Sequence, residues 1–283
     1  MNLRENDIDR IITLAMKEDA VDQDVTTNLL VAKDQVSEAA VISRENAVVC
    51  GLKIAARIFQ RYNRAVRLQF HCQDGARIQT NDRVVSLKGP TAVILSCERV
   101  ALNFLSHLSG IATLTGEFVK RVAPLNVRIF DTRKTTPGLR LLEKMAVRCG
   151  GGENHRFDLS DMVLIKDNHR IAGQKAFSLS GAVALVRRKT KKTIEVEVDT
   201  LSQFKEALPS GPDIILLDNM SCSTMRQAVK LNRAAGRPCL LEASGGVTLR
   251  NVGAIAQTGV DRISVGALTH SARGINFSME FLS

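Results

Sequence analysis

The chain has 283 residues, of which 45% are hydrophobic and 24% are charged, and its formal net charge is +10. This length allows one large or two ordinary domains with a sizeable core, and the composition is ordinary for a globular protein. The positive charge suggests an anionic partner. However, aromatic residues make up only 4% of the chain and no basic low-complexity arm is present, which disfavours binding to nucleic acid.

Cysteine usage and hydropathy bear on the cellular compartment. The six cysteines form no CxxC pair and are irregularly spaced, which favours free thiols in a reducing compartment over disulfides or a structural zinc site. The first residues are charged throughout and lack the apolar centre of a signal peptide, and no apolar run is long enough to cross a membrane. We therefore expect a cytoplasmic protein without a membrane partner.

The first third of the chain mixes helical and extended patterns. Apolar residues recur at a helical period in residues 7–18 and again in residues 51–62. Strands are predicted within residues 35–50, 66–70 and 91–95, and the segment between the last two is rich in turn residues. A long helix is then predicted over residues 96–121, with Ser96 as its N-cap. These elements predict a domain of helices and antiparallel strands.

From about residue 127 short apolar strands alternate with helical segments. The six predicted strands are residues 127–130, 162–165, 194–198, 214–217, 239–242 and 263–265. Helices are predicted between them, among others at residues 139–148, 201–208, 225–235 and 249–257. Such alternation indicates parallel strands with helical crossovers. Six units are too few for a complete eight-fold barrel, so the pattern predicts an incomplete α/β barrel.

Residues 131–169 are unusually rich in cations. The cationic side chains are Arg133, Lys134, Arg140, Lys144, Arg148, Arg156 and Lys166, with His155 and the run Gly150, Gly151, Gly152 among them. They are interleaved with apolar helix and strand residues and therefore belong to a folded element. A folded site with so many Arg and Lys side chains suits a small, highly anionic molecule.

Polar residues and glycines follow the predicted barrel strands, or for the third strand lie within it and after it. In chain order they are Asp131, Thr132, Arg133 and Lys134; Lys166, Asp167 and Asn168; Glu195, Glu197 and Asp199; Asp218 and Asn219; Glu242, Ser244, Gly245 and Gly246; and Gly266. The carboxyl ends of barrel strands carry the active site. Glycines there fit a phosphate group, with the helix expected near Thr248 supplying N-terminal amides. Carboxylates at neighbouring strand ends fit a ribose or Mg²⁺.

Seven separated segments resemble one enzyme family. They are ERVALNFLSHLSGIAT (98–113), DTRKTTPGLRLLEKMAVRCGGGENHR (131–156), LIKDNH (164–169), EVEVD (195–199), LLDNM (216–220), LEASGGV (241–247) and VGALTHS (265–271). In order and spacing they are similar to quinolinate phosphoribosyltransferase, the carboxylating nicotinate-nucleotide pyrophosphorylase. The resemblance implies an N-terminal α/β sandwich domain (1–110), an α/β barrel (111–270) and a C-terminal segment (271–283) that returns to the N-terminal domain.

The resemblance also implies a reaction and a site. Quinolinate and 5-phosphoribosyl 1-pyrophosphate would react with Mg²⁺ to give nicotinate mononucleotide, pyrophosphate and CO2 in NAD synthesis. The chain would form homodimers, or larger assemblies of them, in which Arg99 reaches the partner's site. The residues implied in substrate binding are Arg99, Thr132, Arg133, Lys134, His155, Arg156, Lys166, Glu197, Asp218, Ser244, Gly245, Gly246, Val265, Gly266 and Ala267. Those implied in catalysis are Lys134, Lys166, Glu197 and Asp218, of which Glu197 and Asp218 would also face the metal.

Three alternatives remain on the sequence alone. The first is a transferase of the same fold with another acceptor, such as nicotinate, or a member of the molybdenum-transport-linked branch. The second is a barrel lyase that uses Lys166 or Lys134 as a Schiff-base amine. The third is a non-catalytic basic binding protein, which would leave the strand-end carboxylates without a role. The presence of Arg99, Arg133, Arg156 and Lys166 together favours a dicarboxylate acceptor.

Overall fold

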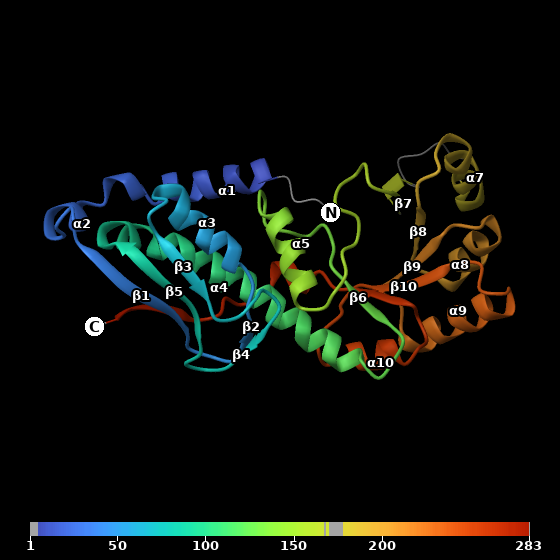
Figure 1. Cartoon of the computed structure of the whole chain (residues 1–283). Coiled ribbons are helices and arrows are strands. Elements are labelled where there is room, and N and C mark those ends of the chain that lie inside the picture. Colours follow the sequence, from blue (N-terminus) through green and yellow to red (C-terminus); the bar gives the residue numbers. More distant parts are fainter. Residues whose placement is uncertain (1–4, 167, 170–177, 283) are drawn as a thin grey trace. The chain divides into compact units, whose positions relative to one another are not determined.

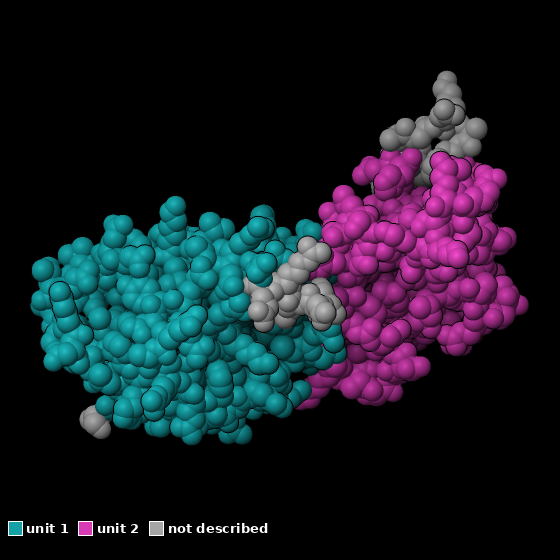
Figure 2. All heavy atoms as spheres, turned by 45° about the horizontal axis from the view of Figure 1, so that its top comes forward, with its two compact units in different colours: residues 1–116, 135–151, 269–283 teal, residues 117–134, 152–268 magenta. Residues whose placement is uncertain are grey.

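The structure is a computed structural model that describes residues 5–166, 168–169 and 178–282. The chain divides into two compact units, which Figure 2 shows in different colours. Unit 1 contains residues 1–116, 135–151 and 269–283, and unit 2 contains residues 117–134 and 152–268. Each unit therefore brings together stretches that lie far apart in the sequence.

Unit 1 contains a four-stranded antiparallel sheet in the order β12-β1-β5-β3. Its strands are β1 (Val36–Ser43), β3 (Arg67–Phe70), β5 (Arg83–Pro90) and β12 (Phe277–Leu282). The last strand of the chain pairs with β1, so that Val41 lies opposite Met279. A separate pair of short strands is formed by β2 (Ala47–Val48) and β4 (Arg77–Ile78).

The helices of unit 1 form because apolar residues repeat at the helical period. They are α1 (Glu5–Glu18), α2 (Val25–Leu30), α3 (Leu52–Tyr62), α5 (Arg140–Cys149) and the first part of α4 (Thr91–Val122). Ile12 of α1 and Ile58 and Phe59 of α3 are buried, and α1 packs against α3 (Figure 1). The carboxylate of Asp24 caps α2 by accepting the N–H of Thr27 at 3.0 Å.

The sequence prediction was wrong around the start of α4. Residues 91–95, predicted as a strand, are helical, because α4 begins at Thr91 rather than at Ser96. The Ser96 hydroxyl instead donates to Asp24 Oδ2 at 2.9 Å. Residues 83–90, which lie in the segment that we described as rich in turn residues, form β5. A short apolar run fits a buried helix as well as a strand, and here the burial of Val93 and Ile94 on the helix decides the outcome.

Unit 2 contains a six-stranded sheet in the order β6-β11-β10-β9-β8-β7, and every pair in it is parallel. Its strands are β6 (Arg128–Phe130), β7 (Val163–Ile165), β8 (Ile194–Val198), β9 (Ile214–Asp218), β10 (Leu240–Ser244) and β11 (Arg262–Ser264). The helices between them, α7 (Leu179–Lys189), α8 (Leu201–Ala207), α9 (Cys222–Ala234) and α10 (Val252–Ala256), lie next to the strands (Figure 1). A short helix, α11 (Ala267–His270), follows β11 in the chain. The predicted fold class, an α/β domain followed by an incomplete α/β barrel, is confirmed.

The crossovers of unit 2 are fixed at their beginnings by side-chain caps. The hydroxyls of Ser178, Thr200 and Ser221 accept backbone N–H groups at the starts of α7, α8 and α9 over 3.0–3.2 Å. The caps of α8 and α9 come two to three residues after the ends of β8 and β9. Because all six strands are parallel, their carboxyl ends meet at one edge of the sheet. Among the described helices, none combines the length and the apolar character needed to span a bilayer.

Candidate functional site

The carboxyl edge of the unit 2 sheet gathers most of the predicted site residues. They are Thr132, Arg133 and Lys134 after β6, Lys166 after β7, Glu197 in β8, Asp218 at the end of β9, Ser244 to Gly246 at the end of β10, and Val265 to Ala267 after β11. Asp167, also predicted there, lies outside the described residues. Cations, carboxylates and glycines therefore share one edge of one sheet.

Arg133 and Arg156 form the cationic centre of this edge. The Arg133 Nε atom is buried and has no hydrogen-bond partner among the described residues. Arg156 is only 9% exposed, and burial and the nearby Arg133 guanidinium lower the pKa of Arg156 below its ordinary value. A negative charge stabilises two guanidiniums that repel each other in a partly desolvated site. A bound anion with two acidic groups would supply it.

The segment that carries Arg156 is attached to the end of β6. Glu153 forms a bridge with Phe130 and donates its N–H to the Ile129 carbonyl at 2.8 Å. The N–H of His155 donates to Oδ1 of the fully buried Asp131 at 2.8 Å. These backbone contacts join residues 153–155 to the first strand of the sheet, which places Arg156 next to the segment that carries Arg133.

The side chain of His155 is buried against the strands of the sheet, where it contacts Glu195 and Glu242. Its Nε2 lies 2.9 Å from Glu195 Oε2 and 3.4 Å from Glu242 Oε1, and its side chain is 7% exposed. Burial lowers the pKa of His155, but the hydrogen bond to Glu195 and the charge of Glu195 outweigh it and raise the pKa above its ordinary value. The N–H of Arg156 donates to His155 Nδ1 at 2.8 Å. The neutral ring therefore carries its proton on Nε2, where it faces Glu195.

Glu242 forms an ion pair with Arg262. Arg262 Nε lies 2.8 Å from Glu242 Oε2, and its guanidinium lies 3.8 Å from the centre of the Phe130 ring. Burial and the neighbouring Glu195 carboxylate raise the pKa of Glu242 to about 7, although His155 and Arg262 act in the opposite direction. The four side chains form a buried ion network inside the sheet.

The ligand atoms of His155, Glu195 and Glu242 lie within 4.8 Å of one another, a spacing that is compatible with a metal centre. Two observations oppose it. Arg262 already neutralises Glu242, and a cation would be repelled by it. The Nδ1 atom of His155 accepts a backbone N–H, so the Nε2 lone pair is used by a proton and not available to a metal.

The carboxylates at the rim have oxygen atoms suited to Mg²⁺. Glu197 Oε2 lies 3.6 Å from Lys166 Nζ, and the side chain of Glu197 is 17% exposed. Asp218 Oδ2 accepts the side-chain N–H of Asn219 at 2.7 Å. The two carboxylates come from the paired strands β8 and β9. Hard oxygen donors that remain partly open to solvent match the preference of Mg²⁺, which retains several waters.

The glycines after β10 allow the backbone of their loop to approach Asn219 closely. Gly245 and Gly246 have φ angles of +92° and +58°, and Asn219 donates its N–H to the Ser244 carbonyl at 2.9 Å. A Cβ on Gly245 would overlap Asn219 Oδ1 and lie 2.9 Å from Asn219 N. The helix expected near Thr248 begins only at Val252. The backbone of the loop itself, rather than the first turn of a long helix, therefore faces any phosphate there.

Other predicted residues belong to unit 1. Arg99 lies on α4, its side chain is 64% exposed, and it lies 3.7 Å from Glu98. Arg140 and Lys144 lie on α5, where Arg140 Nε donates to Thr135 Oγ1 at 3.1 Å and Lys144 is fully buried. The cation-rich segment of the sequence is thus divided between the two units.

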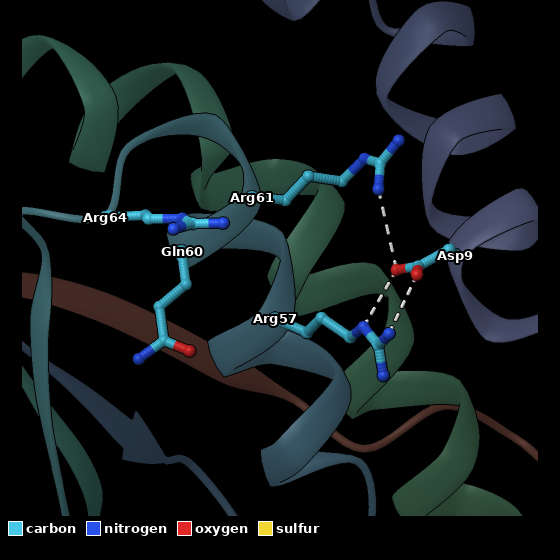
Figure 3. A pocket seen from close by; sticks show the side chains of 5 residues that line it. All are labelled: Asp9, Arg57, Gln60, Arg61 and Arg64. Carbon is cyan, nitrogen blue, oxygen red and sulfur yellow. Dashed lines mark hydrogen bonds and ion pairs between the residues drawn. The ribbon is translucent and has the colours of Figure 1, made fainter. Parts of the chain in front are cut away.

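Unit 1 also has an arginine-rich pocket that we did not predict from the sequence. Its volume is about 690 Å³, and it is lined by Asp9, Arg57, Gln60, Arg61 and Arg64 (Figure 3). Arg57 donates two hydrogen bonds of 2.8 Å to Asp9, and Arg61 lies 3.5 Å from the same carboxylate. The hydrogen bond from Arg57 lowers the pKa of Asp9. The contacts join α1 to α3.

The residues that sequence reasoning missed are the internal partners of His155. Glu195 and Glu242 were noted only as strand-end acids, and Arg262 was not noted at all. One signal was present in the sequence. In residues 194–198, IEVEV, the period of two places Glu195 and Glu197 on the same face of the strand, so that one of the two lies deeper in the sheet.

Comparisons with known proteins agree with this geometry. The models of the N-terminal and C-terminal domains of quinolinate phosphoribosyl transferase match residues 24–109 and 111–280. A probable carboxylating nicotinate-nucleotide pyrophosphorylase of Synechocystis sp. is 43% identical over 247 residues, which are 87% of this chain and 83% of that protein. The carboxylating enzyme of Mycobacterium leprae is 39% identical over 260 residues, with coverages of 91% and 90%.

Solved structures give the same result. The nicotinate-nucleotide pyrophosphorylase of Francisella tularensis superimposes with a TM-score of 0.93 at 36% identity, covering 99% of this chain and 98% of that one. The resemblance found in the sequence is confirmed, and the chain belongs to the quinolinate phosphoribosyltransferase family.

Proposed function

We propose that this chain transfers the phosphoribosyl group of 5-phosphoribosyl 1-pyrophosphate to quinolinate in NAD synthesis, with release of CO2. The products are nicotinate mononucleotide and pyrophosphate. The support is the named activity of its relatives, such as the carboxylating enzyme of M. leprae, together with the cationic edge of unit 2. Arg99, Lys134 and Lys166 are proposed to add further positive charge.

The observation that carries this proposal is the pair Arg133 and Arg156. Neither guanidinium forms an ion pair with the residues that the structure describes, and Arg156 has its pKa lowered by burial and by Arg133. Quinolinate carries two carboxylates on adjacent ring carbons. A planar guanidinium can bind a carboxylate through two parallel hydrogen bonds. We therefore assign the dicarboxylate to this pair and place the His155 ring behind it.

The cosubstrate is assigned to other residues of the same edge. The backbone of Ser244, Gly245 and Gly246, together with Val265, Gly266 and Ala267, would bind the 5-phosphate through N–H groups that glycine leaves accessible. Thr132 and Lys134 are proposed to contact the pyrophosphate. Glu197 and Asp218 would face the ribose hydroxyls, and their hard oxygen atoms would also hold Mg²⁺, which when bound neutralises pyrophosphate charge.

The reaction begins when the pyridine nitrogen attacks the anomeric carbon. The N–C1′ bond forms while the C1′–O bond to pyrophosphate breaks, and the leaving group takes the electron pair. Positive charge develops on the ribose, and the carboxylates of Glu197 and Asp218 would stabilise it. Lys134 and Lys166 would stabilise the departing pyrophosphate. Holding both substrates in line provides a further large part of the rate enhancement.

Decarboxylation follows at the ring. The C2–carboxylate bond breaks, CO2 leaves, and the electron pair remains on C2 next to the positively charged ring nitrogen. A proton from solvent water then adds to C2 and gives nicotinate mononucleotide. The quaternised nitrogen serves as the electron sink, so this step needs no group beyond the substrate itself. The carboxylate at C3 stays on the product and keeps its contact with one arginine of the pair.

We further propose a homodimer with shared sites, in which Arg99 of one chain reaches the site of its partner. The side chain of Arg99 is 64% exposed, and among the described residues its ion-pair partner is Glu98 at 3.7 Å, which leaves most of the guanidinium accessible.

A product assay tests the proposed function. Purified protein is mixed with 5-phosphoribosyl 1-pyrophosphate and Mg²⁺, with either quinolinate or nicotinate as the acceptor, and nicotinate mononucleotide is measured. We expect turnover with quinolinate only. Turnover with nicotinate alone would retain the transferase and replace the acceptor, and no product with either would refute the proposal.

A further inference from the structure

The interior of the unit 2 sheet contains a charged layer where apolar packing is usual. Glu195 and Glu242 have no exposed surface, and Arg262 is 8% exposed. The layers of side chains inside α/β barrels are mostly branched and apolar. Burying charged groups costs free energy that their mutual attraction often fails to recover. The presence of such a network therefore does not show that it stabilises the fold. Its contacts suggest a role in placing other side chains.

This layer lies directly beneath the proposed site. On β8, Glu195 precedes Glu197 by two positions, and on β10, Glu242 precedes Ser244 by two positions. Residues two apart in a strand lie on the same face of the sheet. The buried carboxylates are therefore the inner neighbours of the rim residues that we assign to the ribose and the phosphate.

A continuous chain of contacts leads from this layer to the substrate arginine. Arg262 Nε contacts Glu242 Oε2 at 2.8 Å, Glu242 Oε1 lies 3.4 Å from His155 Nε2, and Glu195 Oε2 lies 2.9 Å from the same atom. On the other side of the ring, Nδ1 accepts the N–H of Arg156 at 2.8 Å. The orientation of the ring thus fixes the backbone from which the Arg156 side chain extends.

The layer also supplies the electrostatic compensation that this edge requires. Arg133 repels the Arg156 guanidinium, whereas the negative charges of Glu195 and Glu197 favour it. Without Glu195, the repulsion between the two arginines would be less compensated before substrate binds. Phe130, over which the Arg262 guanidinium stacks at 3.8 Å, holds the outer end of the chain of contacts in place.

We propose that Glu195, Glu242 and Arg262 are positioning residues, which hold the His155 ring in its Nε2–H form and thereby fix Arg156 next to Arg133 for the dicarboxylate substrate. The proposal rests on the proposed function for the identity of that substrate. It extends the site inward by one layer of side chains that touch no reacting atom.

Kinetics of Glu195→Gln and Arg262→Met test the positioning role. Glutamine keeps an acceptor for His155 Nε2–H but removes the charge, and methionine keeps apolar volume against Phe130. We expect each change to raise the KM for quinolinate roughly 10-fold or more, with a smaller change in the KM for phosphoribosyl pyrophosphate. Arg262→Lys, which keeps the charge beside Glu242, should restore most of the loss relative to Arg262→Met.

The matched control is Glu206→Gln, because Glu206 lies in the same unit and accepts the Leu179 N–H at 2.9 Å without a link to the site. It should leave both KM values unchanged. A merely structural role would lower the melting temperature of Glu195→Gln and Arg262→Met while leaving their KM values for quinolinate at the wild-type level. That result would overturn the proposal.

If the variants do not fold, a measurement on the unmodified full chain tests the proposal. Nitrogen-15 NMR of the His155 ring, assigned through its backbone, should show a protonated Nε2 and an unprotonated Nδ1 at a pH above the ring's pKa. Addition of diamagnetic Zn²⁺ alone should leave these signals in place. A protonated Nδ1, or metal bound at Nε2, would contradict the proposal. This readout does not use turnover, so a protein inactive with quinolinate would refute the proposed function and leave this test valid.

Discussion

Replacing Arg133 by methionine should separate the binding role of this side chain from the stability of the fold. Arg133 Nε is buried without a hydrogen-bond partner among the described residues, and the guanidinium acts on Arg156 only by repulsion. Its removal therefore breaks no hydrogen bond of Nε and no ion pair with the residues that the structure describes. We expect the free energy of unfolding to stay the same or to rise by about 1 kcal/mol, since an unsatisfied buried polar group costs about 1–3 kcal/mol.

The effect on catalysis should be large. A hydrogen bond to a charged group contributes about 1.5–3 kcal/mol, so two of them to one carboxylate contribute roughly 3–6 kcal/mol. At about 1.4 kcal/mol for each factor of ten, kcat/KM for quinolinate should fall by roughly 10²–10⁴-fold. The assays are chemical denaturation of the ligand-free protein and initial rates over a range of quinolinate concentrations.

Arg128→Met is the matched control for this variant. Arg128 lies at the first position of β6, is 54% exposed and pairs with Glu153 at 3.2 Å. An exposed pair of this kind contributes about 0–1 kcal/mol, so the control should lose little stability and keep its kcat/KM. If Arg133→Met loses stability and activity in the same proportion, or keeps its activity, the assignment of Arg133 to substrate binding is refuted.

Three further predictions concern other parts of the molecule. Gly245→Ala should lower both stability and activity, because its Cβ would overlap Asn219 Oδ1 at a φ of +92°; a variant with wild-type melting and kinetics would contradict the close approach of the two residues. The pKa of Glu242 is raised from 4.5 to about 7, so its contribution to stability is present below about pH 4.5 and is lost as the pH rises through about 7. This loss of unfolding free energy amounts to at most about 3 kcal/mol. Denaturation curves measured at several pH values should show that the unfolding free energy of Glu242→Gln lacks this decline. Arg99→Ala chains mixed with Lys166→Ala chains should regain activity through hybrid dimers with one intact site, and mixtures that exchange subunits but stay inactive would argue against shared sites.

The strand–helix pattern of unit 2 was predictable because its strands are buried on both faces. Continuous apolar runs such as IILL at residues 214–217 stand out from the helices that flank them, and the family resemblance, the fold class and the enzyme activity are confirmed. The wrong assignment of residues 91–95 shows the limit of this reasoning. A short apolar run fits two periods, and tertiary burial along α4 selected the helical one.

The candidate site was predictable at its rim and not in its interior. Lys166 follows β7, Glu197 lies near the end of β8 and Asp218 ends β9, so their place at the carboxyl edge could be inferred from the apolar runs beside them. The partners of His155 could not, because contacts between β8, β10 and the loop after α5 depend on strand order and register. The individual site roles and the domain boundaries stay predictions.

The most direct test of the central claim is the stoichiometry of a single turnover. Quinolinate labelled in the carboxylate at C2 is incubated with excess enzyme, phosphoribosyl pyrophosphate and Mg²⁺. We expect one labelled CO2 and one pyrophosphate for each nicotinate mononucleotide formed, with no label left in the nucleotide. Release of pyrophosphate without labelled CO2, or of CO2 without the nucleotide, would contradict it.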